Sequence, residues 1–211
     1  MTNKEDLLLI FTRNPELGKC KTRLAATIGD PAALEVYRFL LQHTVNITQR
    51  LKVSKTVYYS EAIWENDIWP KRTYAKALQK GSDLGERMAQ AFRDGFKAGY
   101  KRIIIIGSDM YDLSPEDLEK AFDCLKTNDF VLGPANDGGY YLMGMKAFKP
   151  ALFKDKSWGM SSVLSSSLND LKDEKVALLE PRNDIDVYED IKDNAAFATF
   201  LKHMTNDETT T

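Results

Sequence analysis

Short apolar runs that alternate with longer helical segments limit the folds open to this chain more than any other feature. Residues 7–11 are wholly apolar, and residues 103–106 are four consecutive isoleucines. Strands need such side chains when helices cover both faces of a parallel sheet. Between these two runs, apolar residues in 31–51 recur with the spacing of one helix face. The alternation predicts an α/β fold with three layers, in which a mostly parallel, doubly wound sheet lies between helices.

One strand of this sheet is expected to run antiparallel to the others. The strands predicted at 130–133 and 140–145 are separated by Asn136-Asp137-Gly138-Gly139, which favours a tight turn and leaves no room for a crossover helix. Further strands are predicted at 53–59, 102–106 and 176–179, and helices at 31–51, from 84 to a stop at Gly99, from 114 onwards, at 161–171 and at 187–204.

Helix boundaries and loops complete the expected organisation. Asp30 and Ser114 are the predicted N-caps of two helices, each followed by a proline in the first turn, and Asp117 stands three residues after Ser114. Residues 60–70 have no clean period and are expected to be mostly loop. We expect a single domain over residues 1–204 and a flexible polar tail over residues 205–211.

The bulk composition argues against several classes of function. With 29 Lys and Arg against 31 Asp and Glu, the formal net charge is −2, so no basic field is available to bind nucleic acid or an anionic membrane surface. No apolar run approaches the roughly 20 residues of a membrane span, and the first residues do not resemble a signal peptide. Cys20 and Cys124 form no C-x-x-C pair and are expected to be reduced thiols. We therefore expect a cytoplasmic protein.

A cluster of cations follows the first strand. Its members are Arg13, Lys19, Lys21 and Arg23. Arginine can hold phosphate oxygens through two hydrogen bonds, and Gly18 in the same loop lets backbone N–H groups approach an anion. The loop therefore favours binding of nucleotide phosphates, although a solvated basic loop explains the spacing equally well. It is not a P-loop, because Arg13 and Cys20 stand where that motif needs glycine and Ser or Thr.

A carboxylate stands at the end of the most apolar strand. Asp109 directly follows Gly107-Ser108, where a rigid strand end would hold its side chain in place. Mg²⁺ and Mn²⁺ prefer oxygen ligands, commonly one or two carboxylates together with phosphates and water. Asp109 is therefore the candidate metal ligand, whereas Asp112 is expected to support the turn before the next helix.

Two further acidic segments come after later strands. The turn at Asn136–Gly139 needs no ligand, yet its adjacent glycines also permit close approach of a substrate to Asp137. Asp184 and Asp186 would lie on one side of an extended segment, where both carboxylates could face one cation. The alternative role for Asp186 is the N-cap of the helix expected after it.

Several motifs, taken in order, resemble the bacterial family of domain of unknown function 2064 (DUF2064). They are F-T-R-N-P-E-L-G-K-C-K-T-R-L at 11–24, D-L-G-E-R-M at 83–88, I-G-S-D at 106–109, G-P-A-N-D-G-G-Y-Y-L-M-G at 133–144 and D-I-D-V-Y-E-D at 184–190. The resemblance covers nearly the whole chain, from about residue 7 to residue 190. The family is similar to nucleotide-diphospho-sugar transferases of the glycosyltransferase-A (GT-A) fold, and some members are described as arsenosugar-biosynthesis glycosyltransferases. More distantly, it resembles guanylyltransferases.

This resemblance and the composition of the cationic loop together imply which residues form the site. The implied nucleotide-binding residues are Thr12, Arg13, Gly18, Lys21, Arg23, Asp83, Leu84, Gly85 and Arg87. Asp109 would be the metal aspartate, joined by Asp184 and Asp186, with Mg²⁺ or Mn²⁺ as the cofactor. One position departs from the family, because relatives carry Asp-x-Pro where this chain has Asp109-Met110-Tyr111. The departure bears on the geometry of the loop and on activity.

The expected function is metal-dependent transfer of a group from a nucleotide-activated donor to a small-molecule acceptor. Glycosyl transfer from a nucleotide sugar is the preferred reaction, with Asp109 acting through the metal and Asp137 as the general base for an acceptor hydroxyl. Two alternatives stay open. One is a nucleotidyltransferase that releases pyrophosphate, which a two-metal set of three carboxylates would suit. The other is a nucleotide-binding protein without turnover.

Overall fold

The computed structural model describes residues 3–206 and confirms the α/β class. The strands are β1 (Asn3–Thr12), β2 (Val53–Tyr59), β3 (Ala75–Leu78), β4 (Arg102–Ile106), β5 (Phe130–Pro134), β6 (Tyr140–Met145) and β7 (Val176–Leu178). The helices are α1 (Thr22–Ile28), α2 (Asp30–Thr48), α3 (Leu84–Lys97), α4 (Pro115–Thr127), α5 (Val163–Asp170) and α6 (Lys202–Asn206). Three short 3₁₀ segments are η1 (Pro150–Phe153), η2 (Tyr188–Asp190) and η3 (Ala195–Phe200).

These strands form one sheet in the order β3-β2-β1-β4-β6-β5-β7. β6 is antiparallel to both of its neighbours, β4 and β5, while the remaining strand pairs are parallel. The predicted antiparallel strand is therefore confirmed. The strand order first runs from β1 towards β3 and then changes direction at β4. The carboxyl ends of β1 and β4 consequently lie side by side, at the kind of position where open α/β sheets bind ligands.

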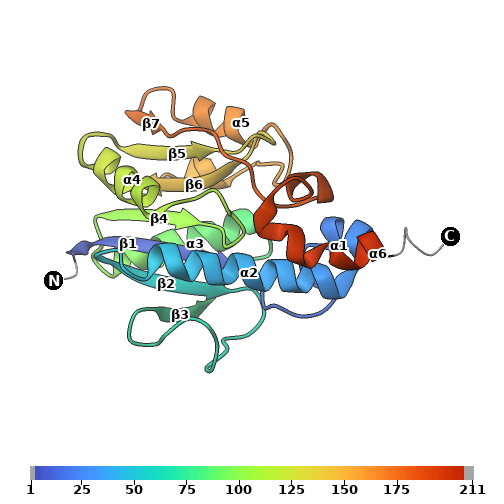
Figure 1. Cartoon of the computed structure of the whole chain (residues 1–211). Coiled ribbons are helices and arrows are strands. Elements are labelled where there is room, and N and C mark those ends of the chain that lie inside the picture. The colour runs from blue at the N-terminus through green and yellow to red at the C-terminus, as the bar shows by residue number, and fades with distance from the viewer. Residues whose placement is uncertain (1–2, 207–211) are drawn as a thin grey trace.

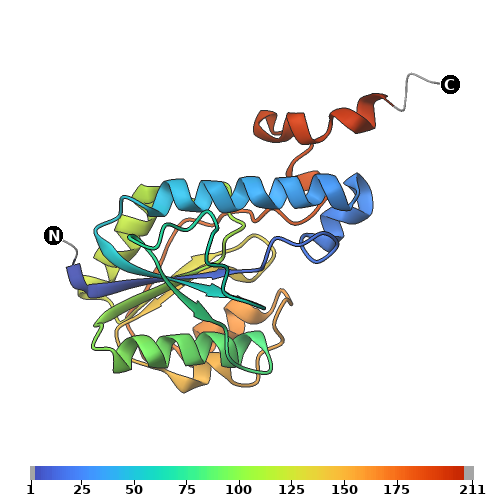
Figure 2. The same ribbon diagram turned by 90° about the horizontal axis from the view of Figure 1, so that it is seen from below.

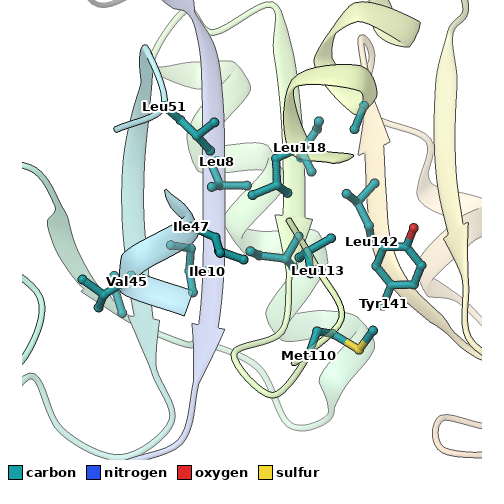
Figure 3. Close-up of a cluster of buried hydrophobic side chains, with 14 of the residues drawn as sticks. Leu8, Ile10, Val45, Ile47, Leu51, Met110, Leu113, Leu118, Tyr141 and Leu142 are labelled. Carbon is teal, nitrogen blue, oxygen red and sulfur yellow. The ribbon is translucent and has the colours of Figure 1, made fainter. Parts of the chain in front are cut away.

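Helices cover both faces of the sheet. The helices α2 and α4 pack against one face, and α3 and α5 pack against the other (Figures 1 and 2). Side chains of β1 alternate between these layers: Leu8 and Ile10 lie among residues of α2 and α4 (Figure 3), whereas Leu7 and Leu9 pack with α3. All four side chains are buried. The unbroken apolar run of this strand thus follows from burial on both faces.

The predicted helix at 187–204 is wrong. This segment forms η2, η3 and α6 with non-helical residues between them, and Figure 2 shows the red segment lying outside α2. The side chain of Asp190 accepts hydrogen bonds from two backbone N–H groups just before η2, and the side chain of Asn194 caps η3. Asp and Asn side chains of this kind compete with continuous helical hydrogen bonding. Ile191 and Phe197 are nevertheless buried, against α1 and α2.

Smaller differences concern one helix cap, one strand and the end of the chain. Gly29 (φ 83°), and not Asp30, is the N-cap of α2, and Asp30 is the first helical residue. The strand β3 escapes prediction because it is short and has no β-branched or aromatic side chain. Of the segment expected to be a flexible tail, residues 205 and 206 end α6, and residues 207–211 lie outside the described residues. Among residues 3–206, no helix is long and apolar enough to span a membrane.

The predicted cap of α4 gives a test of the fold. Ser114 Oγ accepts a hydrogen bond from the backbone N–H of Asp117, whose carboxylate accepts one from the backbone N–H of Ser114. We expect Ser114→Ala to lower the free energy of unfolding by about 1 kcal/mol, measured by urea denaturation. Ser162→Ala is the matched control, because Ser162 is the N-cap of α5 but makes no side-chain capping bond. Equal losses in the two variants would contradict this role of Ser114.

Candidate functional site

The cationic loop begins at the carboxyl end of β1 and is fixed by buried polar side chains. Asn14 Oδ1 accepts hydrogen bonds from the backbone N–H groups of Glu61 and Ala62, and Asn14 Nδ2 donates to the Ala62 carbonyl. The Cys20 thiol donates to the Asn14 carbonyl at 3.2 Å, and burial raises the pKa of this thiol. The loop is thus tied to the segment that follows β2, and Cys20 has a structural role.

The Tyr37 hydroxyl joins the loops that follow β1 and β4. It accepts a hydrogen bond from the backbone N–H of Arg13 at 2.9 Å and lies 3.2 Å from the hydroxyl oxygens of both Thr12 and Ser108. Burial raises the pKa of Tyr37 to about 12, so the hydroxyl keeps its proton at neutral pH. Because Tyr37 belongs to α2, a single helix side chain fixes both strand ends.

Lys21 brings the cationic loop together with two of the predicted metal ligands. Its ammonium nitrogen lies 2.9 Å from Asp109 Oδ2 and 3.8 Å from Asp186 Oδ1, and its side chain is only 6% exposed. Arg23, whose side chain is 73% exposed, forms an ion pair with Asp186. Cations from the first loop therefore lie beside carboxylates from the middle and the end of the chain.

A polar pocket of about 670 Å³ opens between these loops. Seven of the nine predicted nucleotide-binding residues line it, namely Thr12, Arg13, Lys21, Arg23, Asp83, Leu84 and Arg87, together with Asp109 and Asp186. Gly18 and Gly85 are not part of its wall. Gly18 (φ 73°) lies beside Asp30, and Gly85 is buried so closely under the Trp158 indole that a Cβ atom would stand 2.6 Å from Trp158 Nε1. The positive φ of Gly18 and the close packing at Gly85 explain why glycine occurs at these two positions.

Two of the lining residues also have local structural roles. Asp83 is the N-cap of α3 and accepts a hydrogen bond from the backbone N–H of Glu86 at 2.8 Å. Arg87 Nε donates to the Gly81 carbonyl at 3.1 Å. The segment at 83–87 is therefore held at one wall of the pocket by the start of a helix.

An apolar pocket of about 240 Å³ adjoins the polar one. The two pockets share Phe11, Leu84, Gly107 and Asp109. Asp109, with its side chain 38% exposed, therefore stands at the boundary between them. Asp137 and Asp184 line the apolar pocket, so all four predicted catalytic and metal-binding carboxylates lie at one end of the sheet.

Asp184 is close enough to two of the other carboxylates to be affected by their charge. Burial, followed by the negative charges of Asp109 and Asp137, raises the pKa of Asp184. A bound cation would relieve this repulsion. Asp137 is oriented by its own turn, because its Oδ1 accepts a hydrogen bond from the backbone N–H of Gly139 at 2.8 Å. The fourth carboxylate, that of Asp186, is paired with Lys21 and Arg23, and it is not the N-cap that the sequence allowed.

The predicted metal ligands fit a divalent cation in part. Within the described residues, no group of three or more Asp, Glu, His or Cys side chains is arranged to hold a metal ion. Asp186 is paired with two cations and Asp109 with Lys21 alone, while Asp109 and Asp184 line the same pocket. Two carboxylates are a common protein contribution to an Mg²⁺ site whose other ligands are phosphate oxygens and water. These residues therefore suit a cation that binds together with a nucleotide.

Tyr111, at the position where the sequence departs from the family pattern that it otherwise resembles, packs in an aromatic cluster. Its ring centroid lies 5.6 Å from that of Phe39, 5.1 Å from that of His43 and 5.0 Å from that of Phe197. Tyr111 lines neither of the two pockets. Tyr111 thus makes packing contacts away from both pockets, and Asp109 lies at the pocket boundary.

Some residues that hold the site together are not evident from the sequence. Arg182 donates to the Asp112 carbonyl at 2.7 Å and to Asp117 Oδ1 at 2.6 Å, which joins the loop before Asp184 to the loop after Asp109. Asp112 thus contributes to this link through its backbone carbonyl, and not through the side chain from which its role in the turn was predicted. A usable signal exists for Ser108, which directly precedes Asp109 at a strand end. Tyr37 and Arg182 have no such signal, because their partners are distant in sequence.

A pair of tyrosines tests whether Tyr37 organises the site. Tyr37→Phe leaves the backbone N–H of Arg13 and the Ser108 hydroxyl short of a partner, so we expect a loss of about 1–3 kcal/mol in unfolding free energy. Tyr74→Phe is the control, because the Tyr74 hydroxyl is also buried but bonds to Thr48, away from both pockets. Only Tyr37→Phe should also weaken the thermal stabilisation by added nucleotides. Equal nucleotide effects in both variants would be evidence against the proposed organising role.

Comparisons with known proteins agree with this architecture. A model of the family described as "Uncharacterized protein conserved in bacteria (DUF2064)" matches residues 41–160. A crystal structure of a "putative nucleotide-diphospho-sugar transferase" from Desulfovibrio desulfuricans G20 has a TM-score of 0.83 and 30% sequence identity, over 97% of this chain and 96% of that one. The predicted fold is thereby confirmed. No curated protein matches the chain significantly.

Two more distant solved structures share the fold alone. One is 4-diphosphocytidyl-2C-methyl-D-erythritol synthase from Anaerococcus prevotii DSM 20548, with a TM-score of 0.57 and 10% identity over 96% of each chain. The other is the inositol-1-phosphate CTP transferase from T. maritima, with a TM-score of 0.52 and 13% identity, over 94% of this chain and 96% of that one.

Proposed function

This chain belongs to the DUF2064 family, and we propose that it is a transferase with a nucleotide sugar as donor and glycosyl transfer as its reaction. The observation that carries the proposal is the position of Asp109, at the boundary between a pocket lined by cations and an apolar pocket. A donor that spans this boundary would place its phosphates against the cations and its sugar near the apolar walls. The description of the similar D. desulfuricans protein supports the same donor class.

The polar pocket supplies positive charge for the donor's phosphates. Arg13, Lys21 and Arg23 line it, and carboxylates balance two of these cations when no ligand is bound. Arg23 is largely exposed, so its guanidinium can turn from Asp186 to phosphate oxygens. Lys21 is held in place between Asp109 and Asp186, which fixes its charge near the bond that would break.

Glycosyl transfer at this boundary exchanges one bond for another. The acceptor hydroxyl oxygen forms a bond to the anomeric carbon of the sugar while the bond from that carbon to the phosphate oxygen breaks. The nucleoside diphosphate leaves with the bonding electron pair, and Lys21 and Arg23 stabilise its charge. The acceptor proton passes to the carboxylate of Asp137, which lines the apolar pocket and is oriented by its turn.

Mg²⁺ or Mn²⁺ is the proposed cofactor, held by Asp109 and Asp184. When bound, the ion would supply Lewis-acid stabilisation of the leaving phosphates. Electrostatic balance supports this choice. Six carboxylates already match the five Lys and Arg side chains that line the two pockets, so a bound diphosphate adds negative charge that a divalent cation would neutralise.

Replacing the boundary carboxylate tests the cation site. We expect Asp109→Asn to lose the additional stabilisation that Mn²⁺ gives in the presence of a nucleotide, which reaches about 2.7 kcal/mol at a ligand concentration 100-fold above Kd. Thermal-shift titrations with and without Mn²⁺ measure this difference, which any general loss of stability leaves unaffected. Asp112→Asn is the control, because Asp112 is exposed and supports its loop through its carbonyl. A full Mn²⁺ effect in Asp109→Asn would show that the ion binds elsewhere.

Nucleotidyl transfer is the second candidate function. Five cations line the polar pocket, namely Arg13, Lys19, Lys21, Arg23 and Arg87, which suits a triphosphate as well as a diphosphate. In this reaction an acceptor oxygen forms a bond to the α-phosphorus and pyrophosphate leaves. The engagement of Asp186 by Lys21 and Arg23 argues against a second metal ion at that carboxylate, so the two-metal form of this chemistry has less support.

Product analysis separates these functions. Purified protein with Mn²⁺, a panel of nucleotide sugars and nucleoside triphosphates, and hydroxyl acceptors should release a nucleoside diphosphate if it transfers sugars. Pyrophosphate would support nucleotidyl transfer instead, and stabilisation without either product would indicate binding without turnover. We expect Lys21→Gln to slow release by about 10²–10³-fold, as loss of a preorganised charge does. Lys19→Gln should matter less, because that side chain is 66% exposed and is paired with Glu16.

A further inference from the structure

We infer that the apolar pocket selects an uncharged acceptor with an apolar body and a hydroxyl group, and rejects phosphorylated and carboxylated acceptors. This inference rests on the proposed transferase function, which it deepens by naming the acceptor class. Three independent properties of the pocket support it: the apolar character of its walls, the negative sign of its charges and a buried tyrosine hydroxyl without a hydrogen-bond partner among the described residues.

The walls of the pocket are apolar and rigid. Ile105 and Ile106 of β4 and Leu142 and Met143 of β6 form part of the lining, and these strand residues are paired directly across the sheet. Trp158 forms another part and is held against the backbone of α3, where Gly85 leaves room for its indole. Apolar and aromatic surfaces of this kind bind the apolar body of a small molecule.

The charges in the pocket are all negative. Asp109, Asp137 and Asp184 line it, and no Lys, Arg or His is found among its described lining residues. Proteins that bind a phosphate or carboxylate group place cations or several N–H donors around it. In the proposed complex the divalent cation on Asp109 and Asp184 is shared with the phosphates of the donor, so an anionic acceptor would still meet the carboxylate of Asp137 and those phosphates. The nearby Lys21 is already paired with Asp109 and belongs to the polar pocket.

A tyrosine hydroxyl adds hydrogen-bonding capacity without charge. Tyr140 lines the pocket, and its hydroxyl is buried with no hydrogen-bond partner among the described residues. A buried hydroxyl without a partner is unfavourable, and a neutral ligand hydroxyl could satisfy it. The turn that carries Asp137 closes over the same region, because Gly138 packs against the backbone of Ser161. A hydroxyl compound would therefore meet a donor in Tyr140 and a base in Asp137.

Methionine NMR gives a direct readout of this pocket. Met88, Met110, Met143 and Met160 line it, whereas Met204 lies on α6, away from it. The protein is labelled with ¹³C-methyl methionine and kept in metal-free buffer, with inorganic pyrophosphate added to occupy the cationic loop. Addition of 2-phenylethanol should then shift the methyl signals of the four lining methionines and leave that of Met204 unchanged. The matched probe 2-phenylethyl phosphate should bind at least about tenfold more weakly, because like charges repel.

A variant that adds a positive charge tests the opposite change, a gain in binding of the phosphate probe. Met160, at the rim and 61% exposed, can be replaced without disturbing the core. Met160→Lys should strengthen binding of 2-phenylethyl phosphate by about tenfold relative to Met160→Gln, since a cation then faces the phosphate. Tyr140→Phe should keep the stability of the protein while weakening binding of 2-phenylethanol.

The possible outcomes separate this inference from the proposed function. Equal or tighter binding of the phosphate probe to the wild-type pocket would overturn the inference, as would shifts confined to Met204. Selective binding of 2-phenylethanol without any nucleotide product in the transfer assay would support the inference and reject the proposed function. Nucleotide product formed only with phosphorylated acceptors would do the reverse.

Discussion

The parallel pairing of β1 with β4 is the constraint on which the rest of the site depends. Ile10 lies opposite Ile106, so the residues that follow these strands meet at one edge although 96 positions separate Thr12 from Ser108. Only this pairing lets the Tyr37 hydroxyl contact both strand ends and lets Lys21 reach Asp109. The apolar sequence of both strands, which favours burial on two faces, is thus also the cause of the site's position.

Charge balance explains why these cations and carboxylates form ion pairs with one another. The Lys21 ammonium is almost fully buried, and an isolated buried charge would be strongly destabilising, so Asp109 and Asp186 are needed beside it. An anion that binds the cationic loop competes with these carboxylates and leaves them in need of positive charge. A divalent cation at Asp109 and Asp184 would meet that need. Binding of the nucleotide and of the cation should therefore be coupled, since each restores the balance that the other disturbs.

The sequence predicts those parts of the fold and site that depend on local patterns. Strands β2, β4 and β6 and the cap of α4 follow from apolar runs and from a Ser-Pro-Glu-Asp signal. Asp109 could be placed because a residue after a buried strand must lie at the sheet's ligand-binding edge. The helix expected at 187–204 fails because side chains such as that of Asn194 compete for backbone N–H groups, which apolar spacing does not reveal.

Long-range contacts are the part that the sequence leaves undetermined. The burial of Tyr37 is evident from its helical spacing, but its hydroxyl bonds to Arg13, 24 positions away, and to Ser108, 71 positions away. The ion pair that engages Asp186 likewise joins the two ends of the chain. No local pattern encodes such pairs. The sequence could therefore identify Asp184 and Asp186 as a candidate metal site, but it could not predict that Asp186 pairs with cations while Asp184 lines the apolar pocket.

The antiparallel strand β6 explains why the two pockets differ in character. Because β6 runs against β4, its first residues, and not its last, lie at the edge where β4 ends, as the pairing of Leu142 with Ile106 shows. Strands therefore contribute more of the lining of the apolar pocket than of the polar pocket, which loops mainly line. Loops offer N–H groups and mobile charged side chains to phosphates, while a hydrogen-bonded strand offers a fixed, largely apolar surface. In the proposed reaction the acceptor would therefore bind beside strand residues, next to the carboxylate that both pockets share.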